Sequence, residues 1–474
     1  MVGPLVLGIA LSACGTVDKV SDALFGGGGP QPGQQGYVAG FLGGAVADEP
    51  RAALVGREVL SSGGSAADAA VAMGFALSVT LPSRAGLGGG GACLAYAADR
   101  KSANGGIPEA VIFTPTAPNG GVGRGDRPAA LPMMARGMFM LHARYGTLPF
   151  EGLVARAEQL ARFGTPASRA FVRDLNLVSG PLLADPTARA VFSRGGVPLT
   201  EGQSMVQPEL AGTLSQIRIS GVGDLYQGAL ARRIEDSSRQ AGGPIEVADL
   251  RGALPVLAGA LVAPYRNDKV AFLPPPADGG LAAAAAFTVL ARDPNDYGGA
   301  AARGLATAAR WRAGGISAEA VLNADDLPQA GLPALPALPA STSFGALDSA
   351  GNAVICAVTM DNLFGTGRAL PGLGFLLAAS PASVPVPLLS AGMAWSDTEH
   401  AFRAAVGGSG QAGAPVAVAA GLLNALRTGQ PMSVPVPDPG RANVLACARY
   451  LPGRSESCAF ATDPREAGLA AGGG

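Results

Sequence analysis

The hydrophobic pattern alternates between helical and strand periodicity along the chain. From residue 49, the segment EPRAALVGREVLSSGG spaces its apolar residues as in a helix and ends in a glycine pair, a typical helix stop. The next segment, SAADAAVAMGFALSVTLP, is apolar on nearly every face. We therefore expect a buried helix, with Ser65 as its N-cap and Asp68 completing a capping box. The glycine run in GLGGGGACLAYA then leads into a strand.

Helical spacing dominates the middle of the chain. LPMMARGMFMLHARYGTLPF predicts a helix in which His142 is partly buried. Further along, KVAFLPPPADGGLAAAAAFTVLA predicts a strand, a proline stop, a glycine turn and a helix. The apolar run that begins at Leu281 is shorter than the ~18 residues that a membrane-spanning helix needs, so we expect it to be a buried helix.

Two consecutive strands are predicted on either side of a turn at residues 349–351. STSFGALD and NAVICAVTM flank the sequence Ser-Ala-Gly, and a three-residue hairpin loop favours glycine at its last position. This register pairs Asp348 with Asn352 and Ser341 with Thr359. Both faces of the hairpin are largely apolar, so we expect further layers to cover the sheet on both sides.

Ser341 is the polar first residue of that buried hairpin, directly after a Pro/Ala run that ends at Ala340. If the Ala340–Ser341 bond is broken, Ser341 gains a free α-amino group with a reference pKa near ~8. Such an amine can accept the Oγ proton, so one residue supplies both nucleophile and base without a histidine. The alternative is an ordinary solvated strand start after a linker.

Composition and charge narrow the possible functions. The chain has 474 residues, of which 48% are hydrophobic and 15% charged, and its net charge of −1 favours no nucleic-acid partner. The two histidines, His142 and His400, are too few for a histidine-rich metal site, and no GxSxG elbow accompanies them. The glycine run lacks the lysine of a phosphate-binding loop, which favours close backbone packing instead. We expect no cofactor and no metal.

The five cysteines form no CxxC pair, which argues against a zinc site. NVLACARYLPGRSESCAFATD predicts a hairpin that turns near residues 452–453 and places Cys447 opposite Cys458. We expect a disulfide between these two residues, the alternative being two small buried thiols. Cys93 and Cys356, in apolar strands, are expected to stay reduced.

The first residues, MVGPLVLGIALSACG, resemble the signal peptide and lipobox of a bacterial lipoprotein. The resemblance implies a signal peptide over 1–13, lipidation of Cys14, and a flexible tether over 14–39 that is rich in Gly, Pro and Gln. It also implies a periplasmic protein whose membrane contact is a lipid anchor in the outer membrane. No Lys or Arg precedes the apolar run, and the alternative is an ordinary buried N-terminal segment.

Several ordered blocks of the body resemble the γ-glutamyltransferase family of N-terminal-nucleophile enzymes. The blocks are EVLSSGGSAADAAVAMGFALSVTLP with GLGGGGACLAY, then YGTLPF, YQG, PPPADGG, STSFGALDSAGNAVICAVTMDNLFGTG and TDPREAGLAAG. The resemblance implies an α+β fold with four layers in αββα order, two stacked antiparallel sheets between helical layers. It divides one joint domain into a large-subunit segment, 40–340, and a small-subunit segment, 341–474, that remain associated after cleavage.

The resemblance also implies roles for individual residues around the cleavage point. Ser341 takes the place of the family's threonine nucleophile, with cleavage between Ala340 and Ser341, and Thr359 matches the threonine that hydrogen-bonds the nucleophile. Thr342 is the alternative nucleophile if cleavage shifts by one residue. The backbone N–H groups of Gln411 and Ala412 match the oxyanion donors loosely.

The implied substrate pocket departs from the family pattern. Thr114, in FTPTAP, stands where the family has the arginine that binds the substrate α-carboxylate, and Ser383 stands where it has the aspartate that binds the α-amino group. A neutral hydroxyl cannot replace a charge-assisted contact, so we expect altered specificity. Arg84 or Arg368 could supply a relocated positive charge. The remaining implied substrate-binding residues are Ser343, Asp361, where the family has an asparagine, and Ser390.

Three functional hypotheses follow. The first is a self-processing γ-glutamyltransferase-like acyltransferase or hydrolase that acts on a small-molecule γ-glutamyl or related amide, with water or an amine as acceptor. The second is a catalytically inactive family member that serves as a binding or structural lipoprotein of the envelope. The third, a Ser-His-Asp hydrolase that uses His142 or His400, has the least support from motifs.

Overall fold

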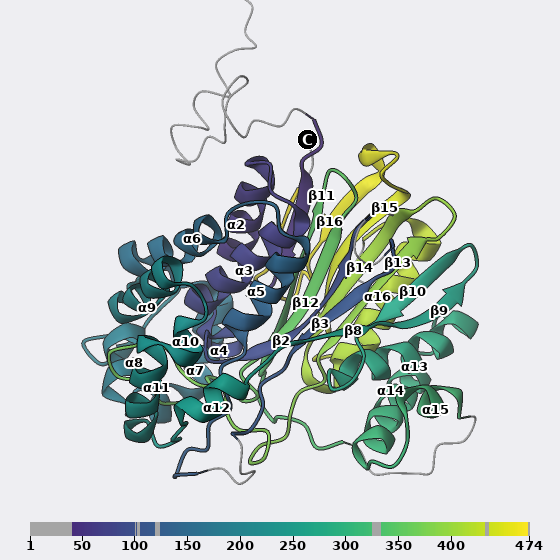
Figure 1. Cartoon of the computed structure of the whole chain (residues 1–474). Helices are drawn as coiled ribbons and strands as arrows, with labels where there is room; N and C mark the ends of the chain where they lie inside the picture. The colour runs from purple at the N-terminus through teal and green to yellow at the C-terminus, as the bar shows by residue number, and fades with distance from the viewer. Residues whose placement is uncertain are drawn as a thin grey trace, which may run out of the picture.

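The computed structural model describes residues 40–99, 101, 105–118, 124–324, 333–431 and 436–472. Two antiparallel sheets stack face to face between two helical layers (Figure 1). This is the αββα arrangement that the sequence blocks imply. The predicted signal peptide, Cys14 and the tether lie outside the described residues.

Strands from both sides of residue 340 build both large sheets. The seven-stranded sheet has the order β17 (Leu469–Gly472), β1 (Gly43–Ala47), β11 (Ser341–Asp348), β12 (Ala353–Thr359), β2 (Gly90–Tyr96), β3 (Glu109–Phe113), β8 (Val256–Gly259). The six-stranded sheet has the order β16 (Cys458–Ala461), β15 (Arg441–Leu451), β14 (Ala401–Ser409), β13 (Ser390–Ser396), β10 (Asp268–Phe272), β9 (Leu261–Tyr265). The short strands β4 (Thr165–Pro166) and β7 (Ser204–Met205), and β5 (Ser193–Arg194) and β6 (Val197–Pro198), pair separately.

Helices cover the outer face of each large sheet (Figure 1). The chain before β8 supplies α2 (Pro50–Ser61), α3 (Ala66–Thr80), α4 (Pro82–Ala85), α5 (Met134–Tyr145), α6 (Phe150–Phe163), α7 (Arg169–Leu182), α8 (Pro186–Phe192), α9 (Pro208–Ser220), α10 (Asp224–Gln227), α11 (Ala229–Gln240) and α12 (Val247–Gly252). On the six-stranded side lie α13 (Asp278–Arg292), α14 (Tyr297–Arg312), α15 (Ala318–Asn323) and α16 (Ala414–Thr428). None of the helices described is long and apolar enough to cross a membrane.

The β11–β12 hairpin has an apolar core on each face, as its pattern predicts. Phe344, Val354 and Val358 pack toward the helical layer, whereas Leu347 and Ile355 pack between the two sheets. A third core joins the six-stranded sheet to its own helices. Because the hairpin is covered on both sides, its first residue begins inside the protein.

The capping residues predicted from the sequence are confirmed at the start of α3. The Ser65 hydroxyl accepts a hydrogen bond from the Asp68 N–H, and the Asp68 carboxylate accepts one from the Ser65 N–H, which completes the predicted capping box. Every residue of α3 is buried, and His142 is partly buried on α5, both as expected.

The hairpin register is also confirmed. Ser341 lies opposite Thr359, and Gly351 closes the turn with a φ of 87°. The preceding glycine run allows strands to approach closely, since a Cβ at Gly91 would lie only 2.4 Å from the Ala357 carbonyl oxygen. The glycines therefore serve backbone packing, as the missing lysine suggested.

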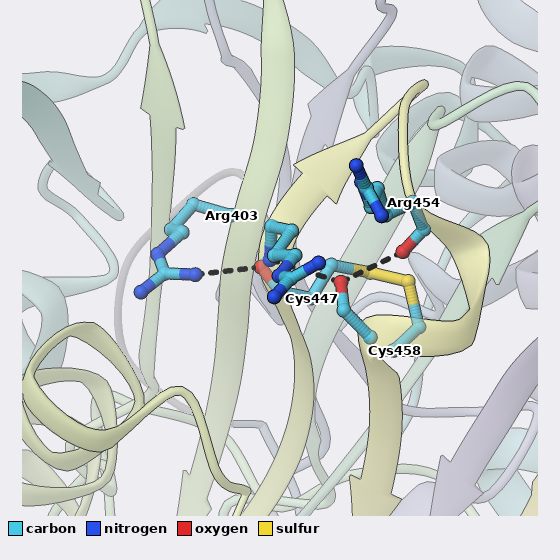
Figure 2. The surroundings of a disulfide bond; sticks show 6 residues. Arg403, Cys447, Arg454 and Cys458 are labelled. Atoms are coloured by element: carbon cyan, nitrogen blue, oxygen red, sulfur yellow. Dashed lines mark hydrogen bonds between the residues drawn. A yellow bond between two sulfur atoms is a disulfide. The ribbon is translucent and has the colours of Figure 1, made fainter.

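Two disulfides are present, and one of them contradicts the sequence prediction. Figure 2 shows the expected bond between Cys447 on β15 and Cys458 on β16, which face each other across the predicted hairpin. Cys93 and Cys356, which we expected to be reduced, form the other. That expectation is wrong because β2 pairs with β12 and sets these two residues directly opposite each other.

Candidate active site

Ser341 is the first residue of β11, an inner strand of the seven-stranded sheet, and only 4% of its surface is exposed. Ala340, on the other side of the predicted cleavage bond, is also buried. The structure therefore places this peptide bond inside the protein, so the alternative of a solvated strand start is wrong.

The Ala340 carbonyl oxygen accepts two hydrogen bonds from the end of β12. The Thr359 hydroxyl donates one at 2.7 Å and the Met360 N–H donates another at 3.2 Å. Thr359 Oγ1 in turn accepts the Asp361 N–H at 2.7 Å, which fixes the orientation of the hydroxyl. The two donors polarise the carbonyl and are placed to stabilise negative charge that develops on its oxygen.

Asp361 follows Thr359 by two residues, and its side chain is buried. Its backbone φ is 58°, a left-handed conformation that Asp and Asn adopt more readily than most residues. Its Oδ2 atom has no hydrogen-bond partner among the described residues. Burial raises the pKa of Asp361 to about 8, so the carboxyl group is mostly protonated at neutral pH.

A second buried carboxyl group, that of Asp48, lies directly after β1 and accepts hydrogen bonds from residues on three strands. Its Oδ2 accepts from the Thr342 hydroxyl at 2.7 Å, the Ser343 N–H at 3.3 Å and the Ser409 hydroxyl at 3.3 Å. Its Oδ1 accepts from Asn443 Nδ2 at 2.8 Å. Sequence reasoning missed this cluster because its members come from three strands of two sheets and from the residue after β1.

Asn443 extends the cluster to the candidate site. Its Nδ2 also lies 3.0 Å from the Ser343 carbonyl oxygen and 2.9 Å from Ser343 Oγ. The Ser343 hydroxyl, which we expected to bind substrate, is thus engaged by Asn443 within the protein. The available signal was a polar residue within the apolar β15 segment ANVLACA.

The candidate oxyanion donors lie in a single 3-10 turn, Gln411–Gly413, which Gly410 separates from the end of β14. The first N–H groups of such a turn have no partner within it, which leaves those of Gln411 and Ala412 suited to the role. The Gln411 side chain donates to the carbonyls of Pro336 and Ala337, at 3.0 and 2.8 Å. The turn therefore contacts the segment that leads into Ser341.

The other predicted substrate residues are less closely grouped. Thr114 directly follows β3, at the same end of the strands as Ser341. β3 lies three strands from β11, which separates Thr114 from Ser341 by about 14 Å at ordinary strand spacing. Ser383 is exposed in a turn, and its N–H donates to the Ser380 carbonyl. Ser390 is fully buried and its hydroxyl donates to the Leu388 carbonyl at 2.9 Å.

Both arginines that we considered as relocated positive charges are paired with a carboxylate. Arg84 is buried and makes two short contacts with Asp174, at 2.6 and 2.7 Å. Burial acts to lower the pKa of Arg84, but the Asp174 carboxylate outweighs burial and raises it. Arg368 pairs with Asp126 near the surface. Both guanidinium groups have carboxylate partners, which argues against a carboxylate-binding role in this state.

The two histidines lie in other parts of the fold. His142 Nε2 lies 2.7 Å from the Leu148 carbonyl in the helical layer, and His400 lies in the turn between β13 and β14. Across the part of the chain that the structure describes, no group of three or more His, Cys, Asp or Glu side chains could hold a metal ion.

Solved structures share this fold. The cephalosporin acylase from Bacillus halodurans aligns over 93% of this chain and 98% of its own, with a TM-score of 0.73 and 19% identity. The γ-glutamyltranspeptidase of Helicobacter pylori aligns over 58% of this chain and 86% of its own, with a TM-score of 0.51 and 28% identity. The first comparison establishes the arrangement of layers, and the second links it to the family that the sequence blocks resemble.

Curated sequences and a family model give the same result. The glutathione hydrolase proenzyme of Escherichia coli is 32% identical over 269 residues, which are 53% of this chain and 44% of that protein. The acylase ACY 1 proenzyme of a Pseudomonas strain is 31% identical over 260 residues, 52% of this chain and 47% of that protein. The chain thus spans about half the length of the curated relatives it matches. Since the model for Gamma-glutamyltranspeptidase matches residues 52–305, more than half of the chain, the protein belongs to the gamma-glutamyltranspeptidase family.

Proposed function

We propose that the protein is a self-processing amide hydrolase or acyltransferase that uses Ser341 as an N-terminal nucleophile. The observation that carries this proposal is the Ala340 carbonyl, held by the Thr359 hydroxyl and the Met360 N–H directly before a buried strand. The family model ends at residue 305, so this geometry supports the role of Ser341 independently of that match. The names of the relatives, glutathione hydrolase and acylase, favour amide chemistry.

The proposed processing step is intramolecular. Ser341 Oγ attacks the Ala340 carbonyl carbon and loses its proton, while Thr359 and Met360 stabilise the charge on the carbonyl oxygen. The C–N bond then breaks and the nitrogen is protonated, which leaves Ala340 as an ester on Oγ. Water hydrolyses the ester, and the products are an Ala340 carboxylate and a Ser341 with a free hydroxyl and a free α-amine.

Turnover would use the new amine as the base. It accepts the Oγ proton as the hydroxyl attacks a substrate amide, and the acyl group then passes from Ser341 to water or an amine. Because Ser341 is buried in the uncut chain, an external substrate can reach it only after the preceding residues move away. The N–H groups of Gln411 and Ala412 are our candidates for the oxyanion contacts of this second reaction.

The pocket is proposed to have altered specificity. Thr114 and Ser383 carry no charge, so they cannot pair with an α-carboxylate and an α-ammonium group. We expect the purified protein to hydrolyse an acyl anilide without these groups at least about tenfold faster, in kcat/KM, than a γ-glutamyl anilide. Efficient turnover of the γ-glutamyl anilide would contradict this assignment.

Paired variants make that test sharper. Thr114→Arg alone should improve γ-glutamyl turnover little, because the α-ammonium would still lack a partner. Thr114→Arg combined with Ser383→Asp should improve it by more than the two single gains together. Turnover of the uncharged anilide by the same variants serves as the control for general damage to the site.

We also propose that the protein is a periplasmic lipoprotein anchored through Cys14. Two disulfides support an oxidising compartment, where such bonds persist. The Cys14→Ser variant should move from the membrane fraction to the soluble periplasmic fraction, as followed by immunoblotting. Equal membrane association of parent and variant would show that Cys14 is not the anchor.

A further inference from the structure

Asp48 joins the two sheets at the point where the candidate nucleophile begins. Asp48 follows β1 and contacts Thr342 and Ser343 on β11, all in or next to the seven-stranded sheet. Its other partners, Ser409 on β14 and Asn443 on β15, belong to the six-stranded sheet. One buried side chain thus connects strands of both sheets, beside the direct hydrogen bonds from Asn443 Nδ2 to Ser343.

The two sheets approach closely here. Gly407 on β14 lies against Ser343, and a Cβ at Gly407 would come within 2.7 Å of Ser343 Cβ. Only a residue without a side chain fits this approach. The close approach brings the hydroxyls of Thr342 and Ser409 and the amide of Asn443 within hydrogen-bond distance of Asp48.

Asp48 is the common acceptor of the cluster. Four donor groups converge on Asp48, and a carboxylate offers about four acceptor positions and no donor. The Arg84 guanidinium, although paired with Asp174, adds an electrostatic attraction to Asp48 that offsets part of the cost of burial.

These contacts lie next to both parts of the proposed reaction centre. Thr342 directly follows the candidate nucleophile Ser341, while Ser409 precedes the candidate oxyanion donors Gln411 and Ala412 by two and three residues. We propose that Asp48 is a positioning residue that holds the nucleophile and the oxyanion donors at a fixed separation. This inference rests on the proposed function, because it assigns Asp48 a part in that reaction.

The Asp48→Asn variant tests the proposal with little change of shape. An amide can be oriented to accept from Asn443, and the hydroxyls of Thr342 and Ser409 can rotate, but the Ser343 N–H then faces another donor. The matched control is Asp68→Asn. Asp68 is equally buried and accepts from several donors of Ser65, Thr147 and Leu148 in the helical layer.

Amide hydrogen exchange gives a readout that does not depend on activity. In Asp48→Asn, peptides that contain 342–343 and 409–412 should both exchange at least about tenfold faster than in the parent. In Asp68→Asn only the peptides around 65–68 and 147–148 should change. Faster exchange at 342–343 with unchanged exchange at 409–412 would overturn the proposal.

Kinetics supply the second readout. Asp48→Asn should lower kcat on an acyl anilide about 10- to 100-fold, with KM within about twofold of the parent, because misplacement of reacting groups acts on the chemical step. A kcat equal to that of the parent would overturn the positioning role. If the parent itself shows no turnover, the proposed function fails, and the exchange data still decide whether Asp48 couples the two segments.

Discussion

Replacement of Ser341 by alanine is expected to leave the chain as one uncut polypeptide. The variant lacks the hydroxyl that attacks the Ala340 carbonyl, whereas the two donors to that carbonyl remain in place. We expect cleavage to slow by at least about 10³-fold, in line with the loss of a nucleophile elsewhere. Reducing gel electrophoresis of freshly purified protein, followed over time, measures the rate.

Two further variants show whether the effect is specific. Ser341→Thr keeps the hydroxyl and should still be cut, since threonine is the residue that the family resemblance implies here. Ser78→Ala removes another buried serine hydroxyl, one that donates to the Gly74 carbonyl of its own helix, and should be cut at the parental rate. Parental cleavage of Ser341→Ala at the same bond would exclude Ser341 as the nucleophile.

Asp361→Asn is expected to remove a pH-dependent loss of stability. The folded pKa of about 8 lies above the ordinary value of 3.8, so the folded state holds its proton longer than the unfolded state. This contribution to the free energy of unfolding is full below pH ~4 and is lost as pH rises through about 8. Between pH 5 and 8.5 the parent should therefore lose on the order of a few kcal/mol that the variant keeps.

Urea unfolding of both proteins at the two pH values gives the difference directly. Asn362→Asp is the matched control, because it adds a carboxylate at the exposed neighbouring position, where water solvates the charge. That control should follow the parent at both pH values. Equal pH dependence in the parent and Asp361→Asn would show that Asp361 ionises in the folded protein as it does in water.

The sequence predicted the parts of the fold that depend on local pattern. The capping box of Ser65 and Asp68, the buried helix that contains the apolar run from Leu281, and the pairing of Ser341 with Thr359 all depend on residues close together in the chain. Each combines a periodicity with a turn or cap signal a few residues away, so the pattern alone fixes it. The Cys447–Cys458 bond belongs to the same class, since its hairpin is local. The glycine turn predicted before the run from Leu281 is wrong, because α13 begins at Asp278 and includes both glycines.

Features that depend on pairing between distant strands could not be predicted in this way. The Cys93–Cys356 bond requires β2 to pair with β12, across 263 residues, and nothing near either cysteine specifies that register. The Asp48 cluster requires both sheets to be assembled before its donors meet. The pairing of Arg84 with Asp174 likewise depends on α4 packing near α7, so the sequence left Arg84 as a candidate substrate-binding charge although the structure shows it to be paired.

The most direct test of the account is the covalent state of the purified parent protein. The sample must be reduced first, because the Cys93–Cys356 bond would join the two fragments after cleavage. Intact-mass spectrometry with N-terminal sequencing should then find two fragments, one of which begins at Ser341, while the unreduced sample stays a single species. A single uncut chain after reduction would contradict self-processing by Ser341 and favour a family member that is not active as an enzyme.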